Sequence, residues 1–216
     1  MEITHLGHAC VLVQSGGARV LIDPGGFAED FRSVRELDAI VITHQHADHL
    51  DRARLPELVR ANSQAVVLCD PDSLPILTEL GIEASRHPEE GTVVGDTRLE
   101  PVGHIHALIH DDIPRVSNVG LLITARSEPN FYHPGDSLEG EPGGVDVLAF
   151  PLQAPWQRSR DMTAFLRRIA APVAFPIHDG LLSPVGRDLY LTQARGLGRR
   201  ETDVRDLARA GAVPIG

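Results

Sequence analysis

Apolar runs broken by polar turns dominate the first part of the chain. Residues 9–14 and 18–22 are rich in apolar and β-branched side chains, and the Ser-Gly-Gly sequence between them is a turn signal. The two runs therefore predict an antiparallel hairpin. Residues 39–43 are apolar without alternation, which is typical of a strand buried on both faces. Residues 51–61 then carry leucine and valine at helical spacing, so a helix is expected after this strand.

The rest of the chain continues this alternation of strands and helices. Further strands are expected at residues 65–69, 119–124, 145–150 and 173–177, with one or two more in residues 92–102. Further helices are expected at residues 72–80, 160–170, 186–195 and 202–210. No long linker or internal repeat divides the chain. We therefore expect a single domain over residues 1–216, with an α/β fold in which helices cover the sheets.

The most informative polar cluster directly follows the buried strand. It reads His44-Gln45-His46-Ala47-Asp48-His49. Neutral imidazoles and a carboxylate are the ligands that zinc prefers, and an open position on such a metal generates hydroxide near neutral pH. A lone histidine is more often a surface or core residue, but three within six positions beside an aspartate favour a metal site. The cluster predicts a metal-dependent hydrolase.

Other polar residues follow later strands in the same way. His104, His106 and His110 come after the 92–102 region, Asp136 comes after a short strand that ends in Pro-Gly, and His178 comes after residues 173–177. A layered sheet fold can gather such groups at one edge, where sites form. We therefore expect this edge to join the histidine cluster. The residues alone leave open which of the three neighbouring histidines takes part.

Composition and charge narrow the class of partner. The chain has 216 residues and a net charge of −10, and all 20 of its basic residues are arginine. Such a chain has no basic field that would steer it to nucleic acid. It has two cysteines, which indicate a reduced cytoplasm rather than a disulfide scaffold, and no run approaches 18 apolar residues. We expect a cytoplasmic protein without membrane association, and nothing in the sequence indicates its oligomeric state.

The ordered set of polar residues resembles the metallo-β-lactamase fold superfamily over nearly the whole chain. The set is His44-x-His46-x-Asp48-His49, followed by His106, Asp136 and His178. Leu6-Gly7-His8-Ala9 and Ile22-Asp23-Pro24 look like the branch of small bacterial metal-dependent hydrolases similar to ascorbate-6-phosphate lactonase. The resemblance implies a four-layer αββα sandwich with a dinuclear site between the two sheets. The two divalent ions are usually zinc, and sometimes manganese or iron.

The same resemblance implies a role for each residue of the set. His44, His46 and His106 would bind the first metal, Asp48, His49 and His178 the second, and Asp136 would bridge them. A hydroxide formed between the metals would then attack a carbonyl or phosphorus. Asp48 is also a candidate for accepting a proton from the attacking water.

Further candidates lie around this set. His8, Asp23 and His110 are candidates for lining the pocket or for hydrogen bonding to the ligands, because metal-bound histidines usually donate their other N–H to a carboxylate or carbonyl. His87 and His104 are expected to be exposed to solvent. One departure from similar small hydrolases is Gln153, near which a histidine is expected. Its absence puts a proton-donating role there in doubt. Trp156, the single tryptophan, is a candidate pocket wall or packing residue.

Two other activities compete with a two-metal hydrolase of a small molecule. Gly135-Asp136-Ser137-Leu138 spells a block found in one family of serine esterases, with Ser137 as the nucleophile. That serine sits past mid-chain, and no Asp-x-x-His sequence supplies a partner near the C-terminus. Some relatives of the same metal fold are mononuclear iron oxygenases. None of the seven ligands is missing here, which favours catalysis over a binding role. By analogy with the family, the expected reaction is cleavage of an ester, lactone, thioester or phosphoester bond.

Overall fold

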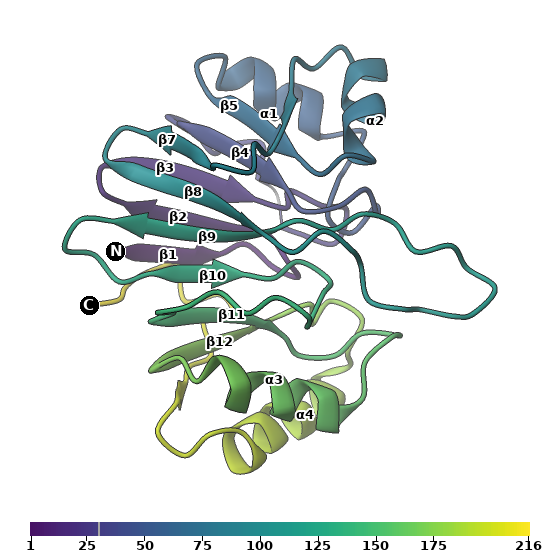
Figure 1. Ribbon diagram of the computed structural model, residues 1–216, viewed down its shortest axis with the longest axis vertical. Coiled ribbons are helices and arrows are strands. Elements are labelled where there is room, and N and C mark those ends of the chain that lie inside the picture. Colours follow the sequence, from purple (N-terminus) through teal and green to yellow (C-terminus); the bar gives the residue numbers. More distant parts are fainter. Residues whose placement is uncertain (30) are drawn as a thin grey trace.

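Two seven-stranded sheets form the centre of the molecule (Figure 1). The computed structural model describes residues 1–29 and 31–216. The first sheet contains β1 (Glu2–His5), β2 (Val11–Ser15), β3 (Ala18–Ile22), β4 (Ala39–Ile42), β5 (Val66–Cys69), β6 (Ser85–Arg86) and β14 (Ala212–Pro214). The second contains β7 (Thr92–Val94), β8 (Thr97–Val102), β9 (Gly120–Ala125), β10 (Phe131–His133), β11 (Val147–Pro151), β12 (Val173–Ile177) and β13 (Asp203–Val204). The helices of the described residues are α1 (Leu55–Ala61), α2 (Ser73–Glu79), α3 (Ser159–Ile169) and α4 (Pro184–Leu197).

The strand order gives each sheet a parallel part beside an antiparallel part. The first sheet runs β14-β1-β2-β3-β4-β5-β6, and the second runs β13-β12-β11-β10-β9-β8-β7. Strands β3 to β6 are parallel to one another, and so are β10 to β13. The hairpin expected from residues 9–22 is present as β2 and β3.

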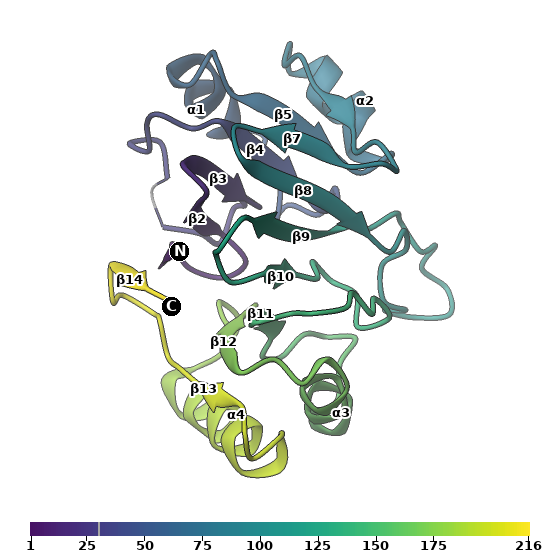
Figure 2. The same cartoon turned by 60° about the vertical axis from the view of Figure 1, so that its left-hand side comes forward.

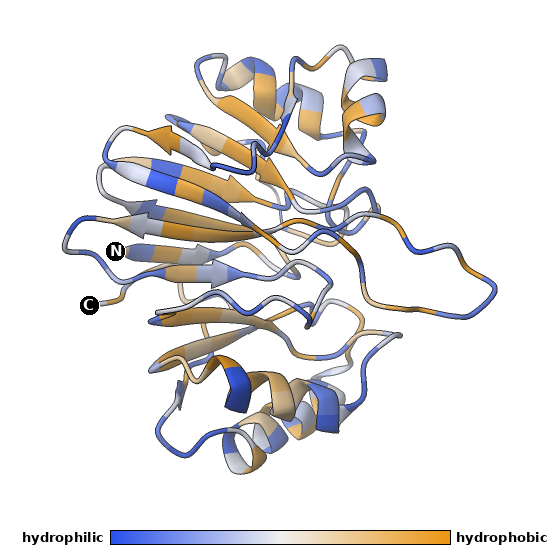
Figure 3. Cartoon of the chain, viewed as in Figure 1, coloured by the Kyte–Doolittle hydropathy of each residue, from blue (hydrophilic) through white to orange (hydrophobic). Residues whose placement is uncertain are grey.

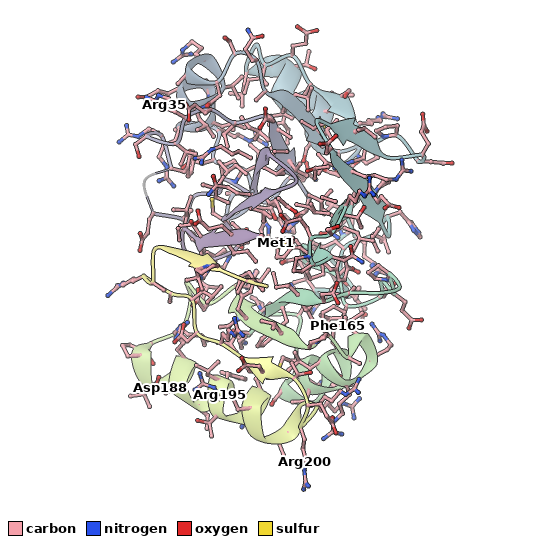
Figure 4. All side chains as sticks on the ribbon, turned by 90° about the vertical axis from the view of Figure 1, so that its left-hand side faces the viewer. Met1, Arg35, Phe165, Asp188, Arg195 and Arg200 are labelled. Carbon is pink, nitrogen blue, oxygen red and sulfur yellow. The ribbon has the colours of Figure 1, made fainter. Side chains whose placement is uncertain are left out.

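Three apolar layers hold the sheets and helices together. The central layer joins residues of both sheets, among them Val41 of β4 and Phe175 of β12. A second layer packs α1 and α2 on the outer face of the first sheet, and a third packs α3 and α4 on the outer face of the second (Figure 2). Figure 4 marks Phe165 of α3, which is buried in this third layer, and Arg200 beyond α4, which is exposed. The fold is thus the expected four-layer αββα sandwich.

Strand β4 illustrates why the pattern of a buried strand lacks alternation. All four of its residues are buried. Ala39 and Val41 face the central layer, whereas Ile40 and Ile42 face the layer beneath α1 and α2. Both faces of this strand are covered, so both must be apolar. The hydropathy colouring shows mainly apolar residues on the central strands of both sheets (Figure 3).

The segments that carry chemistry leave the sheets at one edge. Asp23 follows β3, the histidine cluster follows β4, and His106 lies beyond β8. Asp136 lies beyond β10, and His178 follows β12 directly. Because parallel strands end at a common edge, residues far apart in the chain meet there.

Some elements differ from the sequence-based expectations. The helix expected at 202–210 is wrong: Asp203 and Val204 pair with β12 as strand β13, because the edge of the second sheet offers ladder partners that a short helix would leave unused. Helix α1 begins at Leu55 rather than at residue 51, since the Asp51 carboxylate accepts hydrogen bonds from the N–H groups of Ala53 and Arg54 and holds a turn there. Strands β1, β6 and β14 are further elements that the apolar pattern does not predict.

The described residues contain no helix that is both long and apolar enough to cross a bilayer. Cys10 and Cys69 are buried free thiols.

Candidate metal centre

The histidine cluster occupies a tight turn that leaves β4. His44 and His49 are fully buried, and the N–H groups of His49 and Leu50 both donate to the His46 carbonyl. Gly25 packs against this turn so closely that a Cβ there would lie 1.7 Å from the Asp48 carbonyl oxygen. Only glycine can occupy this position without moving the turn.

One buried carboxylate orients two of the histidines. Asp23 Oδ2 accepts from His49 Nδ1 at 2.7 Å and from Thr43 Oγ1 at 2.7 Å, while Oδ1 accepts from the Thr43 N–H at 2.7 Å. Because the Thr43 hydroxyl donates to Asp23, it can accept from His44 Nδ1, which lies 3.1 Å away. Both rings therefore carry a proton on Nδ1 and leave the Nε2 lone pair free, which is the tautomer that a metal requires.

The histidines from the second sheet are oriented in the same manner by backbone carbonyls. His106 Nδ1 donates to the Ala107 carbonyl at 2.6 Å, and His178 Nδ1 donates to the Gln153 carbonyl at 2.9 Å. Their Nε2 atoms therefore also face inward and are the ring nitrogens that a metal could take.

Four of the inward-facing atoms are buried without a hydrogen-bond partner: His49 Nε2, His106 Nε2, His178 Nε2 and Asp136 Oδ1. Buried polar atoms without partners are rare because each costs free energy, so such a group indicates a ligand. The separations are 3.1 Å for His44 Nε2 to His46 Nδ1, 3.2 Å for His49 Nε2 to Asp136 Oδ1, 3.4 Å for His106 Nε2 to Asp136 Oδ2, and 3.1 Å for His178 Nε2 to Asp136 Oδ2. Zinc–nitrogen bonds of 2.0–2.1 Å at tetrahedral angles place neighbouring ligand atoms about 3.3 Å apart. The donor set therefore fits a metal.

The donor atoms fall into groups that share members. One group contains His44, His46 and His106, a second contains His8, Asp48, His49 and His178, and a third joins His44, His49 and Asp136. Within each group the ligand atoms lie within 4.8 Å of one another. Asp136 therefore lies beside donors of both other groups.

His8 holds Asp48 rather than presenting a lone pair of its own. Its Nδ1 accepts from the Gly180 N–H at 3.1 Å, which leaves the proton on Nε2. Nε2 then donates to Asp48 Oδ2 at 3.0 Å. The same carboxylate oxygen lies 3.4 Å from His178 Nε2. His8 thus fixes the position of a carboxylate that faces the second group of donors.

Hydrogen bonds hold Asp136 in place at its backbone N–H and at one carboxylate oxygen. Its N–H donates to Asn118 Oδ1 at 2.9 Å, and the Asn118 amide donates to the Pro134 carbonyl, so the preceding turn is clamped. The indole N–H of Trp156 donates to Asp136 Oδ2 at 3.0 Å. The unpartnered oxygen of this carboxylate, Oδ1, is the one near His49.

The backbone at this edge is strained where the site requires it. His8, Asp23 and His178 all have positive φ, at 52°, 48° and 58°. Histidine and aspartate tolerate this left-handed region better than most residues, but each such position has a cost. The His178 N–H donates to the His8 carbonyl at 2.9 Å, so two of the strained residues support each other.

The pKa values follow from burial and from the crowding of charges. Burial lowers the pKa of His44, and the nearby His49 lowers it further. Burial alone would lower the pKa of His178, but the Asp136 and Asp48 carboxylates that face its Nε2 raise it to about 10. Burial would raise the pKa of Asp136, but His178 and His49 hold it well below its usual range. Protons on the histidines and divalent cations thus neutralise the same carboxylates, and binding of a cation must displace protons.

The structure brings together most of the residues predicted from sequence. His44, His46, Asp48, His49, His106, Asp136 and His178 form the cluster, and His8 and Asp23 hydrogen-bond to its members. His110 does not reach the cluster: its side chain is 63% exposed, and its ring nitrogen accepts from the Asp112 N–H. His104 is exposed as expected, whereas His87 is half-buried.

Ser137 has no base beside it among the described residues. Its hydroxyl accepts from the Glu139 N–H at 3.3 Å, and no histidine is paired with it.

Thr43, Asn118 and Trp156 also act at the site. Threonine at the end of a strand and asparagine before one are too common to indicate a role. A lone tryptophan indicates packing at most, and its hydrogen bond to Asp136 leaves no signal in the sequence. The neighbouring Gln153 contributes its backbone carbonyl, which any residue could supply.

Comparison with known proteins adds four findings. The family described as "Beta-lactamase superfamily domain" matches residues 2–178. Protein Rv0786c of Mycobacterium tuberculosis is 37% identical over 191 residues, which cover 88% of this chain and 89% of that protein. A UPF0173 metal-dependent hydrolase of Geobacillus thermodenitrificans is 26% identical, with 87% of this chain and 89% of that protein covered. Among solved structures, the metallo-β-lactamase fold protein YhfI of Bacillus subtilis superposes with a TM-score of 0.70 at 17% identity, over 95% of each chain.

Proposed function

Since this chain belongs to the β-lactamase superfamily, we propose that it is a metal-dependent hydrolase of a small molecule. The observation that carries the proposal is the convergence of three buried histidine nitrogens and one carboxylate oxygen that have no hydrogen-bond partner. The name of its Geobacillus relative, a metal-dependent hydrolase, supports the same class.

The donor set supports two ions rather than one. His44, His46 and His106 would hold the first, and Asp48, His49 and His178 the second, with Asp136 between them. Imidazole and carboxylate ligands suit zinc best, and manganese or iron less well. When bound, such ions would lower the pKa of a coordinated water and would stabilise negative charge that develops on a substrate oxygen.

The residues of the chain prepare this chemistry without a nucleophilic side chain. Asp23 fixes the tautomers of His44 and His49, and His8 holds Asp48. The Asp48 side chain is 19% exposed, so it is the carboxylate of the cluster that is open to the solvent side and can accept a proton from the attacking water. The bond cleaved is an ester, lactone, thioester or phosphoester.

The alternatives receive less support. A mononuclear iron oxygenase needs one facial set of two histidines and a carboxylate, whereas the overlapping groups at this edge contain seven donors besides His8. A serine esterase using Ser137 lacks a paired histidine within the described residues. We place the enzyme in the cytoplasm because both cysteines are buried free thiols.

Metal analysis and hydrolysis together test the proposal. We expect two metal ions per chain, loss of hydrolysis after chelation, and recovery on addition of zinc or manganese. Asp136→Ala should lose metal and activity together, while Ser137→Ala should keep both. One iron per chain with consumption of dioxygen would refute the proposal in favour of an oxygenase, and loss of activity in Ser137→Ala with metal intact would favour the esterase.

A further inference from the structure

His106 is carried by a long loop that must be held against the opposite sheet. It lies in residues 103–119, the loop between β8 and β9, which projects beyond the edge of the sheets (Figure 1). His44 and His46, the other members of its group of donors, follow β4 in the first sheet. For these three rings to hold one ion, the loop must be fixed against the first sheet to within about 0.5 Å.

Hydrogen bonds join the arm of this loop that carries His106 to the arm that returns to β9. The His106 N–H donates to the Val116 carbonyl at 3.0 Å, and Ile105 and Ser117 form an antiparallel bridge. The Arg115 guanidinium donates to the His106 carbonyl at 2.7 Å. The backbone of His106 is therefore bonded on both sides to the returning arm, and it moves with that arm.

Two aspartates that follow a strand of the first sheet hold Ser117 of the returning arm. The Ser117 Oγ donates to Asp70 Oδ2 and accepts from the Asp72 N–H at 3.1 Å, while the Ser117 N–H donates to Asp72 Oδ2 at 2.7 Å. Asp70 directly follows β5, which pairs with β4. Ser117 thus connects the returning arm to the strand beside the one that His44 and His46 follow.

The burial of Asp70 indicates that its contact with Ser117 has a specific role. The Asp70 side chain is fully buried, and its Oδ2 also accepts from the Asp72 N–H at 2.9 Å. Burying a carboxylate costs free energy that its hydrogen bonds must offset, so an aspartate is an expensive way to end a buried strand. The bond to Ser117 across the two sheets gives this carboxylate a function.

A backbone contact near Ser117 does not replace the bonds that Ser117 makes. The Val119 N–H donates to the Thr43 carbonyl at 2.9 Å, and this bond also joins the two sheets. Val119 lies beyond the point where the two arms of the loop are joined. Ser117, in contrast, is next to Val116, whose carbonyl accepts from the His106 N–H. The bonds of Ser117 are therefore the ones that act on His106 most directly.

We propose that Asp70 and Asp72, acting through Ser117, position His106 for the first metal ion. They are positioning residues, because none of the three belongs to a group of donors. The proposal rests on the two-ion centre proposed above. It adds to that centre the contacts that hold a ligand from the second sheet against the ligands from the first.

The second ion depends on a separate contact between the sheets. The His178 N–H donates to the His8 carbonyl at 2.9 Å, and the His8 side chain holds Asp48. Neither bond involves the loop of residues 103–119. Loss of the Ser117 hydroxyl should therefore weaken binding of the first ion and leave binding of the second unchanged.

Zinc titrations in two backgrounds test this difference between the ions. His178→Ala leaves the first group of donors complete, and His46→Ala leaves the second complete. Competition with a chromophoric chelator measures the zinc affinity of each background with and without Ser117→Ala. We expect Ser117→Ala to lower the affinity about tenfold in His178→Ala, the lower end of the loss found for a direct partner of a ligand. In His46→Ala the change should stay below about twofold.

Thr97→Val is the matched control for a purely structural effect. The buried Thr97 hydroxyl donates to the Ser15 carbonyl at 2.6 Å, so it also joins the two sheets, but Thr97 begins β8, at the end away from His106. Both Thr97→Val and Ser117→Ala should lower the thermal unfolding midpoint, whereas Thr97→Val should keep the zinc affinity of both backgrounds. An equal loss of affinity in the two variants, an equal loss in the two backgrounds, or no loss for Ser117→Ala would each overturn the proposal.

Substitutions of Asp70 in the otherwise native protein give a second test. Asp70 Oδ1 has no hydrogen-bond partner among the described residues, so an amide can place its NH2 there and still accept from Ser117 with its oxygen. We expect Asp70→Asn to keep both zinc affinities within about threefold, and Asp70→Ala to lower one of them about tenfold. Equal affinities in these two variants would refute the role of Asp70. A native protein that binds fewer than two zinc ions would instead refute the two-ion centre itself.

Discussion

Replacing Asp23 with asparagine should weaken the binding of both proposed metal ions. In the native structure, Asp23 Oδ2 accepts two hydrogen bonds, from His49 Nδ1 and from Thr43 Oγ1. An amide nitrogen at that position donates instead of accepting, so the proton of His49 is driven to Nε2, where it blocks the metal. The Thr43 hydroxyl must also turn away, and it then ceases to accept from His44 Nδ1.

The size of the effect follows from the hydrogen bonds that the substitution removes. Loss of a hydrogen-bond partner behind a metal-bound histidine costs about 10- to 100-fold in metal affinity. Because Asp23 supports one ligand of each ion, we expect a loss of that size at both. If Asp23→Asn leaves its donors unpaired, the ion-free protein should also lose about 1–3 kcal/mol of unfolding free energy.

Competition with a chromophoric zinc chelator measures the affinities for the two ions. Thermal unfolding in the presence of excess chelator measures the loss of unfolding free energy of the ion-free protein. Asp38→Asn is the matched control, because Asp38 Oδ2 accepts from the Arg19 N–H at 2.8 Å, at the opposite end of the same pair of strands. This control should keep both metal affinities. If Asp23→Asn binds both ions within twofold of the native affinity, the orienting role is wrong. If only one ion is weakened, the connection through Thr43 is wrong.

Three further predictions concern the same centre. Zinc should change the fluorescence of Trp156, because the indole donates a hydrogen bond to Asp136. Trp156→Phe should abolish that signal and lower the metal affinity about 10-fold. An unchanged metal affinity would contradict this. Gly25→Ala should cost roughly 3 kcal/mol of stability or more and abolish metal binding, because its Cβ would collide with the Asp48 carbonyl; chemical denaturation checks the first effect. The pKa of His178 is raised to about 10 from an ordinary 6.5, so protonation of this side chain stabilises the ion-free protein. The contribution is complete below pH 6.5 and is lost as the pH rises to 10. At pH 7.5 zinc should therefore release protons, seen as a dependence of the calorimetric heat on the ionisation enthalpy of the buffer; heat that does not vary between buffers would refute this.

The strands of the core were accessible from the sequence because their burial leaves a direct pattern. The unbroken apolar run of β4 predicts a strand covered on both faces, and the strand has apolar layers on both sides. The helix predicted at residues 202–210 is wrong because no local pattern reveals what decides the structure there. Their spacing suits a short helix, but the unpaired edge of β12 decides their structure, and that edge is not visible locally.

The metal centre also has residues that the sequence reveals and roles that it does not. The crowding of His44 to His49 signals a metal on its own, and His106 is buried in the cluster while His110 remains outside. The residues alone could not distinguish those two, because both follow the same strand, and only the resemblance to the superfamily favoured His106. Nor could it predict the role of Thr43, since which ring nitrogen holds a proton depends on contacts between segments far apart in the chain.

The donors of the centre come from both sheets, and a bound metal would therefore tie the lifetime of the protein to the supply of that metal. His44 and His49 leave the first sheet, whereas His106, Asp136 and His178 leave the second. An ion held by both would act as a cross-link between the halves of the sandwich, and unfolding would have to release it. Free zinc at 100 times its dissociation constant would add about 2.7 kcal/mol to the unfolding free energy. In a cell short of zinc the chain would then open first at this edge and be degraded sooner, so its abundance would follow the available metal.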